Sequence, residues 1–182
     1  PVPYSGEREK VVVTFCRLNR QKNIPMMLKA FKIFSDSHPE YLLKIYGRGE
    51  EEDNLKQYAE SIGIAEKVQF CGFNSNVHAA IRCAMMYVNS SDYEGISNAM
   101  LEALGMGLPT ICTDCPPGGA RMFIESGKNG FLVPVSDYKA LADAMGKIAD
   151  DAGIRDSFSR ESIKIKDELA LDTICKRWAD LI

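Results

Sequence analysis

Two glutamates, Glu94 and Glu102, stand eight residues apart in a segment that runs from a glycine turn into an apolar helical pattern. On a helix, eight residues correspond to about 12 Å along the axis and about 80° around it. The acid and nucleophile of a glycosidase need carboxyl groups within about 5–10 Å of each other. We therefore expect these carboxylates to hold different parts of one elongated polar ligand, rather than to act together on one bond.

The residues between the two glutamates could bind phosphate at the start of a helix. Gly95 permits close backbone approach, and the amides that follow, at Ile96 and Ser97, are unpaired donors at a positively polarised helix terminus. Ser97 could instead be a helix cap, which is a structural role. Glu94 would repel a bare phosphate but could accept hydrogen bonds from sugar hydroxyls, so a ligand that contains a sugar is favoured.

A basic loop, residues 17–22, follows the first apolar strand. Arg17 and Lys22 bracket this turn and can clasp a diphosphate from two sides, the arginine as a planar fork and the lysine as a point charge. Each charge-assisted hydrogen bond contributes about 1.5–3 kcal/mol. A solvated basic loop without a ligand is the alternative, and this loop alone leaves both interpretations open.

Two glycine-containing turns carry weaker signals. Residues 47–50 hold only two of the three glycines of a dinucleotide fingerprint, because Glu52 occupies the third place, and that fingerprint is expected after the first strand. A nicotinamide dehydrogenase is therefore disfavoured. The turn at 114–121, with paired prolines and paired glycines, either faces a ligand with its amides or simply links a strand to a helix.

The composition is that of a globular domain. The chain has 182 residues, of which 46% are hydrophobic and 26% charged, and its net charge of −3 offers no basic field for nucleic acid. No apolar run approaches the roughly 20 residues that span a bilayer. The chain starts without an initiator methionine or a signal peptide, so we expect a piece of a longer, cytoplasmic protein.

Six cysteines also favour a reducing cytoplasm. Cys16, Cys71, Cys83 and Cys112 lie in or beside apolar segments, where cysteine usually acts as a small buried hydrophobe. Cys112 and Cys115 have Cys-x-x-Cys spacing, but the sequence holds no second such pair and both histidines are distant. We therefore expect neither a zinc site nor a redox pair.

Short β-rich runs alternate with longer amphipathic segments. We expect strands over residues 11–16, 41–46, 68–71, 85–88, 110–112 and 131–133. We expect helices over 24–37, 53–62, 75–83, 97–106 and 137–149, with two further helical stretches from about 153 to 182. This alternation predicts a doubly wound α/β fold, in which helices cover both faces of a parallel sheet and residues 1–182 form one domain.

In such a sheet, ligands bind outside the carboxyl ends of the strands. The loops 17–22, 47–49, 72–74 and 89–95 each follow a predicted strand and therefore fall at this edge. The independent candidate motifs are thus expected to form one site.

Taken in order, these segments resemble the carboxyl-terminal, donor-binding half of the group 1 (family 4) retaining glycosyltransferases with the GT-B fold. The resemblance runs from Val12 to about Asp151 and includes Glu-x₇-Glu, Glu-Ala-x-x-x-Gly-x-Pro and the segment 129–133. It implies a Rossmann-like domain whose amino-terminal acceptor domain is absent here. Cys16 and Asn23 stand where the family usually has glycine, but neither change removes a charged group.

The resemblance implies catalytic roles for Arg17, Lys22 and Glu94. The two cations would hold the diphosphate of a nucleotide sugar and stabilise the charge that builds on it as the sugar leaves. Glu94 would contact the transferred sugar, and the amides of residues 95–97 its hydroxyls and phosphate. Neither a metal nor another cofactor is expected.

The remaining donor-binding residues follow from the same resemblance. Glu102 would hydrogen-bond the ribose, and the loop Gly72, Phe73 and Asn74 would meet the base. Gly47 belongs to the Gly-x-Gly turn of the family. Uracil is the expected base because UDP-sugars are frequent donors in the family, with guanine and adenine as alternatives.

The resemblance implies an enzyme that transfers a hexose, with retention, to a sugar or lipid-linked glycan in polysaccharide biosynthesis. The isolated domain would bind the donor but transfer little or no sugar. The full-length protein could associate with the inner face of the membrane. Alternatives are a GT-B sugar-nucleotide epimerase, a non-catalytic nucleotide-binding module, and an α/β domain without a small ligand.

Overall fold

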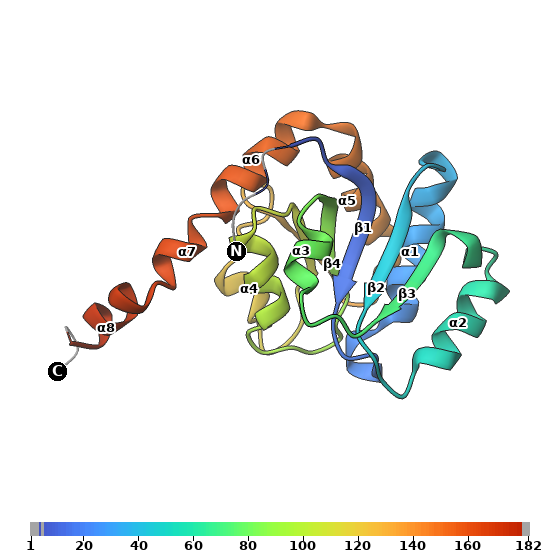
Figure 1. Ribbon diagram of the computed structural model, residues 1–182, viewed down its shortest axis with the longest axis horizontal. Coiled ribbons are helices and arrows are strands. Elements are labelled where there is room, and N and C mark those ends of the chain that lie inside the picture. Colours follow the sequence, from blue (N-terminus) through green and yellow to red (C-terminus); the bar gives the residue numbers. More distant parts are fainter. Residues whose placement is uncertain (1–3, 5, 180–182) are drawn as a thin grey trace.

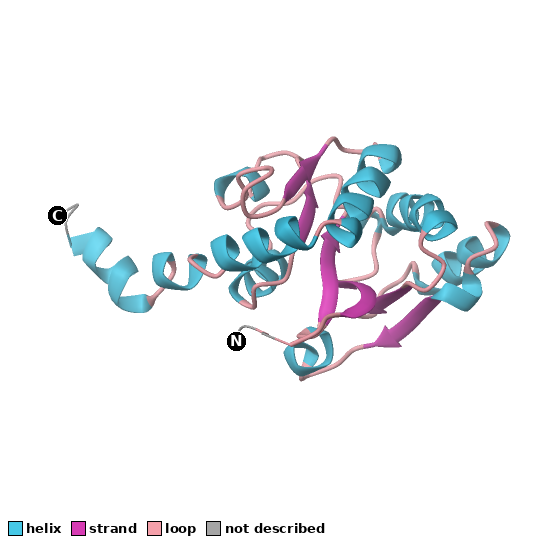
Figure 2. Cartoon of the chain, turned by 90° about the horizontal axis from the view of Figure 1, so that it is seen from above, coloured by secondary structure: helices cyan, strands magenta, loops and turns pink. Residues whose placement is uncertain are grey.

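The computed structural model describes residue 4 and residues 6–179. Its strands form one six-stranded sheet in the order β3-β2-β1-β4-β5-β6, and every neighbouring pair is parallel (Figures 1 and 2). The strands are β1 (Glu9–Phe15), β2 (Leu42–Tyr46), β3 (Val68–Gly72), β4 (Ala84–Asn89), β5 (Thr110–Thr113) and β6 (Phe131–Val133). The predicted doubly wound fold is confirmed.

Helices connect and follow these strands. They are α1 (Ile24–Ser37), α2 (Glu52–Ser61), α3 (Val77–Ile81), α4 (Asn98–Gly105), α5 (Tyr138–Asp150), α6 (Ala152–Ser162), α7 (Ile165–Glu168) and α8 (Leu171–Ala179). Three 3-10 turns were not predicted: η1 (Arg20–Lys22), η2 (Ala65–Lys67) and η3 (Ala120–Met122). No helix in residues 6–179 is long and apolar enough to cross a membrane.

Alternate side chains of the central strand enter two separate cores. Val12 packs with residues of α1 and α5, whereas Val11, Val13 and Phe15 pack with residues of α4 on the other face. Successive side chains of a strand point to opposite faces, so a strand covered on both sides needs a continuous apolar run. The helices of the two faces can be followed in Figure 1.

The C-terminal part contains three helices, so the prediction of two helical stretches is wrong. Phe158 of α6 enters the core beside α1 and α5, whereas Ile165 of α7, after the break, enters the core beside α4. From there α7 and α8 lead away from the sheet (Figure 1). Residues 180–182, which the prediction included, lie outside the described residues.

The strand order places the loops after β1 and β4 at the point where the chain changes direction along the sheet. After β1 the chain builds β2 and β3 on one side, and after β4 it builds β5 and β6 on the other. Diverging connections leave a crevice at this point, which is where doubly wound sheets bind ligands. The loops 16–23 and 90–97 therefore flank the predicted binding edge.

Asn23 fixes the first of these loops. Its backbone is left-handed, with φ 40° and ψ 48°, which glycine and asparagine tolerate better than other residues. The Asn23 Oδ1 accepts the Met26 N–H at 3.2 Å and caps α1, and its Nδ2 donates to Asp92 Oδ1 at 2.6 Å. An asparagine in place of the family's glycine thus adds a helix cap and a link to the loop after β4.

Replacing Asn23 should separate these contributions. Asn23→Ala should lower the free energy of unfolding by about 2–4 kcal/mol, because it adds left-handed strain and removes the cap. Asn23→Gly keeps the backbone conformation and should lose only about 1 kcal/mol, from the missing hydrogen bonds. Urea denaturation measures both, and equal losses would contradict this role of the backbone.

Candidate active site

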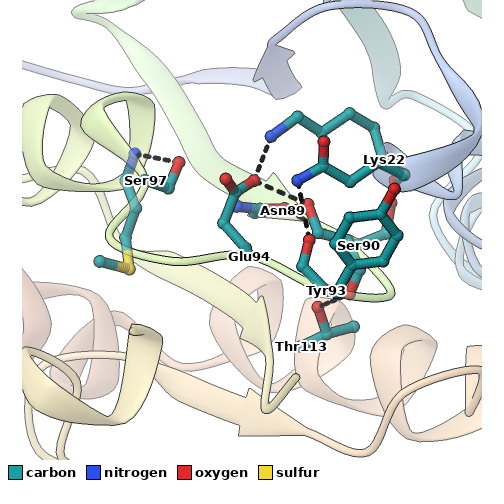
Figure 3. A network of polar contacts seen from close by, with 10 residues as sticks. Lys22, Asn89, Ser90, Tyr93, Glu94, Ser97 and Thr113 are labelled. Carbon is teal, nitrogen blue, oxygen red and sulfur yellow. Dashed lines mark hydrogen bonds and ion pairs between the residues drawn. The ribbon is translucent and has the colours of Figure 1, made fainter. Parts of the chain in front are cut away.

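An ion pair between Lys22 and Glu94 lies at the centre of the site (Figure 3). Lys22 Nζ comes from η1 after β1, and Glu94 Oε2 from the loop after β4, so the pair joins both sides of the crevice. The two side chains are only 15% and 19% exposed. Opposite charges shielded from water in this way interact more strongly than an exposed pair.

A chain of hydrogen bonds orients the Glu94 carboxylate before any ligand arrives (Figure 3). The Ser91 hydroxyl lies 3.2 Å from Glu94 Oε2 and 2.6 Å from Asn89 Oδ1, and Thr113 Oγ1 donates to the Ser91 carbonyl at 2.5 Å. Both contacts to the carboxylate go to Oε2. Within residues 6–179, Oε1 therefore keeps its accepting positions for a ligand.

The basic loop and the loop after β4 are also joined by hydrogen bonds to backbone carbonyl groups. Ser90 Oγ lies 2.8 Å from the Lys22 carbonyl oxygen, and Gln21 Nε2 donates to the Tyr93 carbonyl at 2.9 Å. In return, the Asp92 N–H donates to the Gln21 carbonyl at 2.9 Å. The two loops thus behave as one unit that holds Lys22 against Glu94.

The start of α4 presents free amides beside this pair. Ser97 Oγ accepts the Met100 N–H at 3.3 Å, so Ser97 is the helix cap, as its structural interpretation predicted. In the described part of the chain, the N–H groups of Gly95, Ile96 and Ser97 make no hydrogen bond. These donors, at a positively polarised terminus, are suited to an anion or to hydroxyl oxygens.

The position of Glu94 corrects one geometric expectation. Helix α4 begins at Asn98, so Glu94 lies in the loop before it and only Glu102 is on the helix. The helical offset expected between the two carboxylates therefore does not apply. Their separate roles are nevertheless consistent with their partners, since Glu94 contacts Lys22 and Glu102 contacts His78.

The turn at 114–121 supports the loop of Glu94 from behind. The Glu94 N–H donates to the Pro116 carbonyl at 2.9 Å, and a Cβ on Gly119 would stand 1.9 Å from the Gly95 carbonyl oxygen. Glycine at 119 is thus required by packing. A Cβ on Gly95 itself would meet nothing within 4 Å, so packing within the described residues does not explain that glycine.

A cleft of about 500 Å³ opens at the ends of β1, β2 and β3. It is lined by Phe15, Cys16, Arg17, Tyr46, Gly47, Arg48, Phe73, Asn74 and Val77. Four predicted site residues, Arg17, Gly47, Phe73 and Asn74, are therefore brought together. Gly72 is not in the wall, but its carbonyl accepts the Gly47 N–H at 2.8 Å and so fixes the turn beside it.

The Gly-x-Gly turn packs directly against the loop after β1. A Cβ on Gly47, where φ is 131°, would stand 1.8 Å from the Cys16 carbonyl oxygen, and one on Gly49 would stand 2.1 Å from that of Leu18. The Leu18 N–H donates to the Arg48 carbonyl at 3.0 Å. Both glycines therefore allow two backbones to meet and shape the cleft.

Around the centre, Arg17 occupies an exposed position and Glu102 a half-buried one. Arg17 lines the cleft, and its Nε lies 3.9 Å from Glu50 Oε2. Glu102 Oε2 accepts a hydrogen bond from His78 Nε2 at 2.7 Å. The structure thus separates the two predicted cations, with Arg17 at the cleft and Lys22 at Glu94.

A model of the family described as "Glycosyl transferases group 1" matches residues 3–165. The chain belongs to this family. Among known structures, TarM of S. aureus superposes with a TM-score of 0.91 at 22% identity, over 100% of this chain and 37% of TarM. The fold is therefore that of the C-terminal, Rossmann-like domain of GT-B glycosyltransferases.

Other relatives are similar over nearly the whole chain. The GtfA subunit of a UDP-N-acetylglucosamine–peptide N-acetylglucosaminyltransferase from Streptococcus gordonii is 30% identical over 99% of this chain. A poly(glycerol-phosphate) alpha-glucosyltransferase from Bacillus subtilis is 27% identical over 96%. The pneumococcal GtfA structure, in complex with UDP and GlcNAc, has 26% identity and a TM-score of 0.86 over 99% of this chain and 37% of that one. The chain spans 35% and 26% of the first two relatives.

The cysteines of this glycosyltransferase domain are all free thiols. Burial raises the pKa of Cys16, in the wall of the cleft, to about 11, and also raises the pKa of Cys112 far above its usual value. Neither is therefore a reactive thiolate near neutral pH.

The prediction that Cys71 is buried is wrong, because β3 is an edge strand and Cys71 lies on its open face. Residues 6–179 contain no cluster of metal-ligating side chains.

Sequence reasoning missed several neighbours of the site, among them His78 and Ser91. His78 belongs to a short helical segment with no motif, and Ser91 looked like an ordinary loop serine. Both contact a predicted glutamate, at 2.7 Å for His78 and 3.2 Å for Ser91. Ser91 could have been found because it is a polar residue three positions before the candidate Glu94. His78 gave no such signal, because it lies 24 residues from Glu102 in the sequence.

Two alanine substitutions in this glycosyltransferase domain form a matched pair. Gly119→Ala should lower the free energy of unfolding by about 2–3 kcal/mol, because its backbone suits alanine but the methyl group would collide with the Gly95 carbonyl. Gly95→Ala should change it by less than about 0.5 kcal/mol. Thermal and urea unfolding test both, and a stable Gly119→Ala variant would contradict the close contact.

Proposed function

We propose that this chain is the donor-binding domain of a retaining hexosyltransferase and that it binds a UDP-sugar. The observation that carries the proposal is the Lys22–Glu94 pair beside the free amides of residues 95–97, next to the cleft. This arrangement places a cation, a sugar-hydroxyl acceptor and a phosphate-binding helix terminus together. A sugar diphosphate carries groups that are complementary to all three.

The electrostatics suit departure of a diphosphate. When the sugar–phosphate bond breaks, negative charge grows on the leaving group and positive character on the anomeric carbon. Lys22, Arg17 and the start of α4 are already in place and would stabilise the negative charge on the leaving diphosphate. These cations would supply the charge that a metal ion supplies elsewhere, so we propose that no metal is needed.

Glu94 is assigned to the donor sugar. Its carboxylate is fixed through Oε2, and Oε1 is available to accept hydrogen bonds from sugar hydroxyls. Since the charge of Glu94 is balanced by Lys22, the site can hold a carboxylate close to a diphosphate. We assign it an orienting role rather than that of a covalent nucleophile.

The cleft is assigned to the base and Glu102 to the ribose. Phe73, Tyr46 and Val77 give the cleft apolar walls suited to a flat ring, and Arg48 supplies hydrogen-bond donors. GtfA is named for a UDP-N-acetylglucosamine donor and its structure contains UDP, which supports uracil over guanine and adenine.

The whole protein is proposed to make α-linked glycans. The Bacillus subtilis relative is named an alpha-glucosyltransferase, and an α-product from an α-linked UDP-sugar means retention. A sugar or lipid-linked glycan is the proposed acceptor, bound by an amino-terminal domain that this chain does not contain. We place the reaction in the cytoplasm, at the inner face of the membrane when the acceptor is a lipid.

Titration with UDP, GDP, ADP and NAD by calorimetry tests the donor site. We expect selective UDP binding, weakened about 10- to 100-fold by Lys22→Ala and by Glu102→Ala, since each removes a charged hydrogen-bonding group. Gly95→Ala should weaken UDP binding without loss of stability. Lys139→Ala and Glu66→Ala, on exposed positions away from the cleft, are the matched controls. Equal effects of the controls, or no UDP binding, would contradict the proposal.

An assay of sugar transfer distinguishes the isolated domain from the full-length enzyme. The isolated chain should give little or no transfer from radiolabelled UDP-sugars to glycan acceptors, because we propose that a second domain binds the acceptor. The full-length protein should be active, and its Glu94→Gln variant should lose most activity, because the change removes the charge that pairs with Lys22 and faces the donor sugar. Transfer by the isolated chain would show that the second domain is dispensable.

A further inference from the structure

Among the described residues, His78 is the one side chain that forms a hydrogen bond with the Glu102 carboxylate. Helix α4 has no basic residue in its last turn, and within residues 6–179 no lysine or arginine lies within ion-pair distance of Glu102. The contact comes from another helix, as His78 Nε2 lies 2.7 Å from Glu102 Oε2. Both side chains are partly open to solvent, at 44% and 40% exposure, so a ligand can reach the pair.

Helix α3 connects this pair to the cleft. Its first residue, Val77, lines the cleft, and its second, His78, contacts Glu102. Its last residue, Ile81, is fully buried in the same core as Leu104 of α4, so both helices pack on one core. The imidazole is therefore held on a packed helix, between the wall of the cleft and the carboxylate.

The contact with His78 leaves the Glu102 carboxylate able to accept hydrogen bonds from two adjacent hydroxyl groups of a ligand. A donor N–H from His78 occupies one position on Oε2, so Oε1 and the second position on Oε2 can still accept hydrogen bonds. A glutamate without such a contact has three free side-chain torsions, and ordering them when a ligand binds costs conformational entropy and weakens binding. A carboxylate held in advance avoids most of that loss.

We propose that His78 is a positioning residue for nucleotide binding, which orients Glu102 toward the two ribose hydroxyls of the donor. This inference rests on the proposed function, because Glu102 can receive a ribose only if the chain binds a nucleotide. His78 touches neither the sugar nor the phosphates. Its effect passes through Glu102 and therefore depends on the ribose hydroxyls.

Calorimetry with UDP and with 2′,3′-dideoxy-UDP, which lacks both hydroxyls, distinguishes this role from a purely structural one. His78→Ala should weaken UDP binding about three- to tenfold and change dideoxy-UDP binding by less than about twofold. In the Glu102→Ala background, His78→Ala should have no further effect on UDP. His78→Gln, which can still donate a hydrogen bond to the carboxylate, should restore most of the affinity, and its unfolding midpoint provides the folding control.

Three results would overturn the assignment: unchanged UDP binding by His78→Ala, an equal loss for both nucleotides, or a loss that persists without Glu102. The equal loss would mean that His78 only supports the wall of the cleft. Failure of the unmodified chain to bind UDP would instead overturn the proposed function, and the positioning role with it.

Discussion

One partly buried ion pair, Lys22 with Glu94, joins the two loops that meet where the sheet changes direction. A charge shielded from water is stable only with a partner, so each of these side chains needs the other. Ser91, Asn89 and the backbone contacts around them hold the pair in one geometry. The free Oε1 of Glu94 and the amides at the start of α4 are thereby fixed before a donor arrives, which is the condition for electrostatic preorganisation.

Close backbone contacts form the frame around this pair. Gly47 and Gly49 bring the turn after β2 against the loop after β1, and Gly119 brings a third turn against Gly95. No side chain fits at these contacts, so the main chain itself determines the width of the site. The side chains of the cleft, such as the largely exposed Phe73, are added to this rigid frame.

Much of this arrangement could be predicted from local patterns. The apolar run that contains Val12 had to be a strand covered on both faces, and alternation of strands and helices determined which loops share one edge. The pattern therefore predicted that the loops of Arg17, Lys22 and Glu94 share that edge, and the strand order places the loops after β1 and β4 there.

The failures concern the orientation of side chains and contacts distant in sequence. The exposure of Cys71 follows from the position of β3 at the sheet edge, which the strand pattern does not give. The separation of Arg17 from Lys22 depends on their different partners, Glu50 and Glu94. His78 carries no local signal because its contact with Glu102 arises only when two helices pack on one core.

The glycine contacts are fixed by packing, whereas the side chains of the cleft wall are open to change. This difference affects how nucleotide selectivity could change by mutation. Phe73 and Arg48 can change identity without moving the backbone, whereas Gly47 and Gly119 cannot. A mutant library confined to the cleft wall should therefore remain mostly folded while its nucleotide selectivity drifts. Changes of the cleft wall could therefore alter the nucleotide that such a domain binds while the glycine frame stays the same.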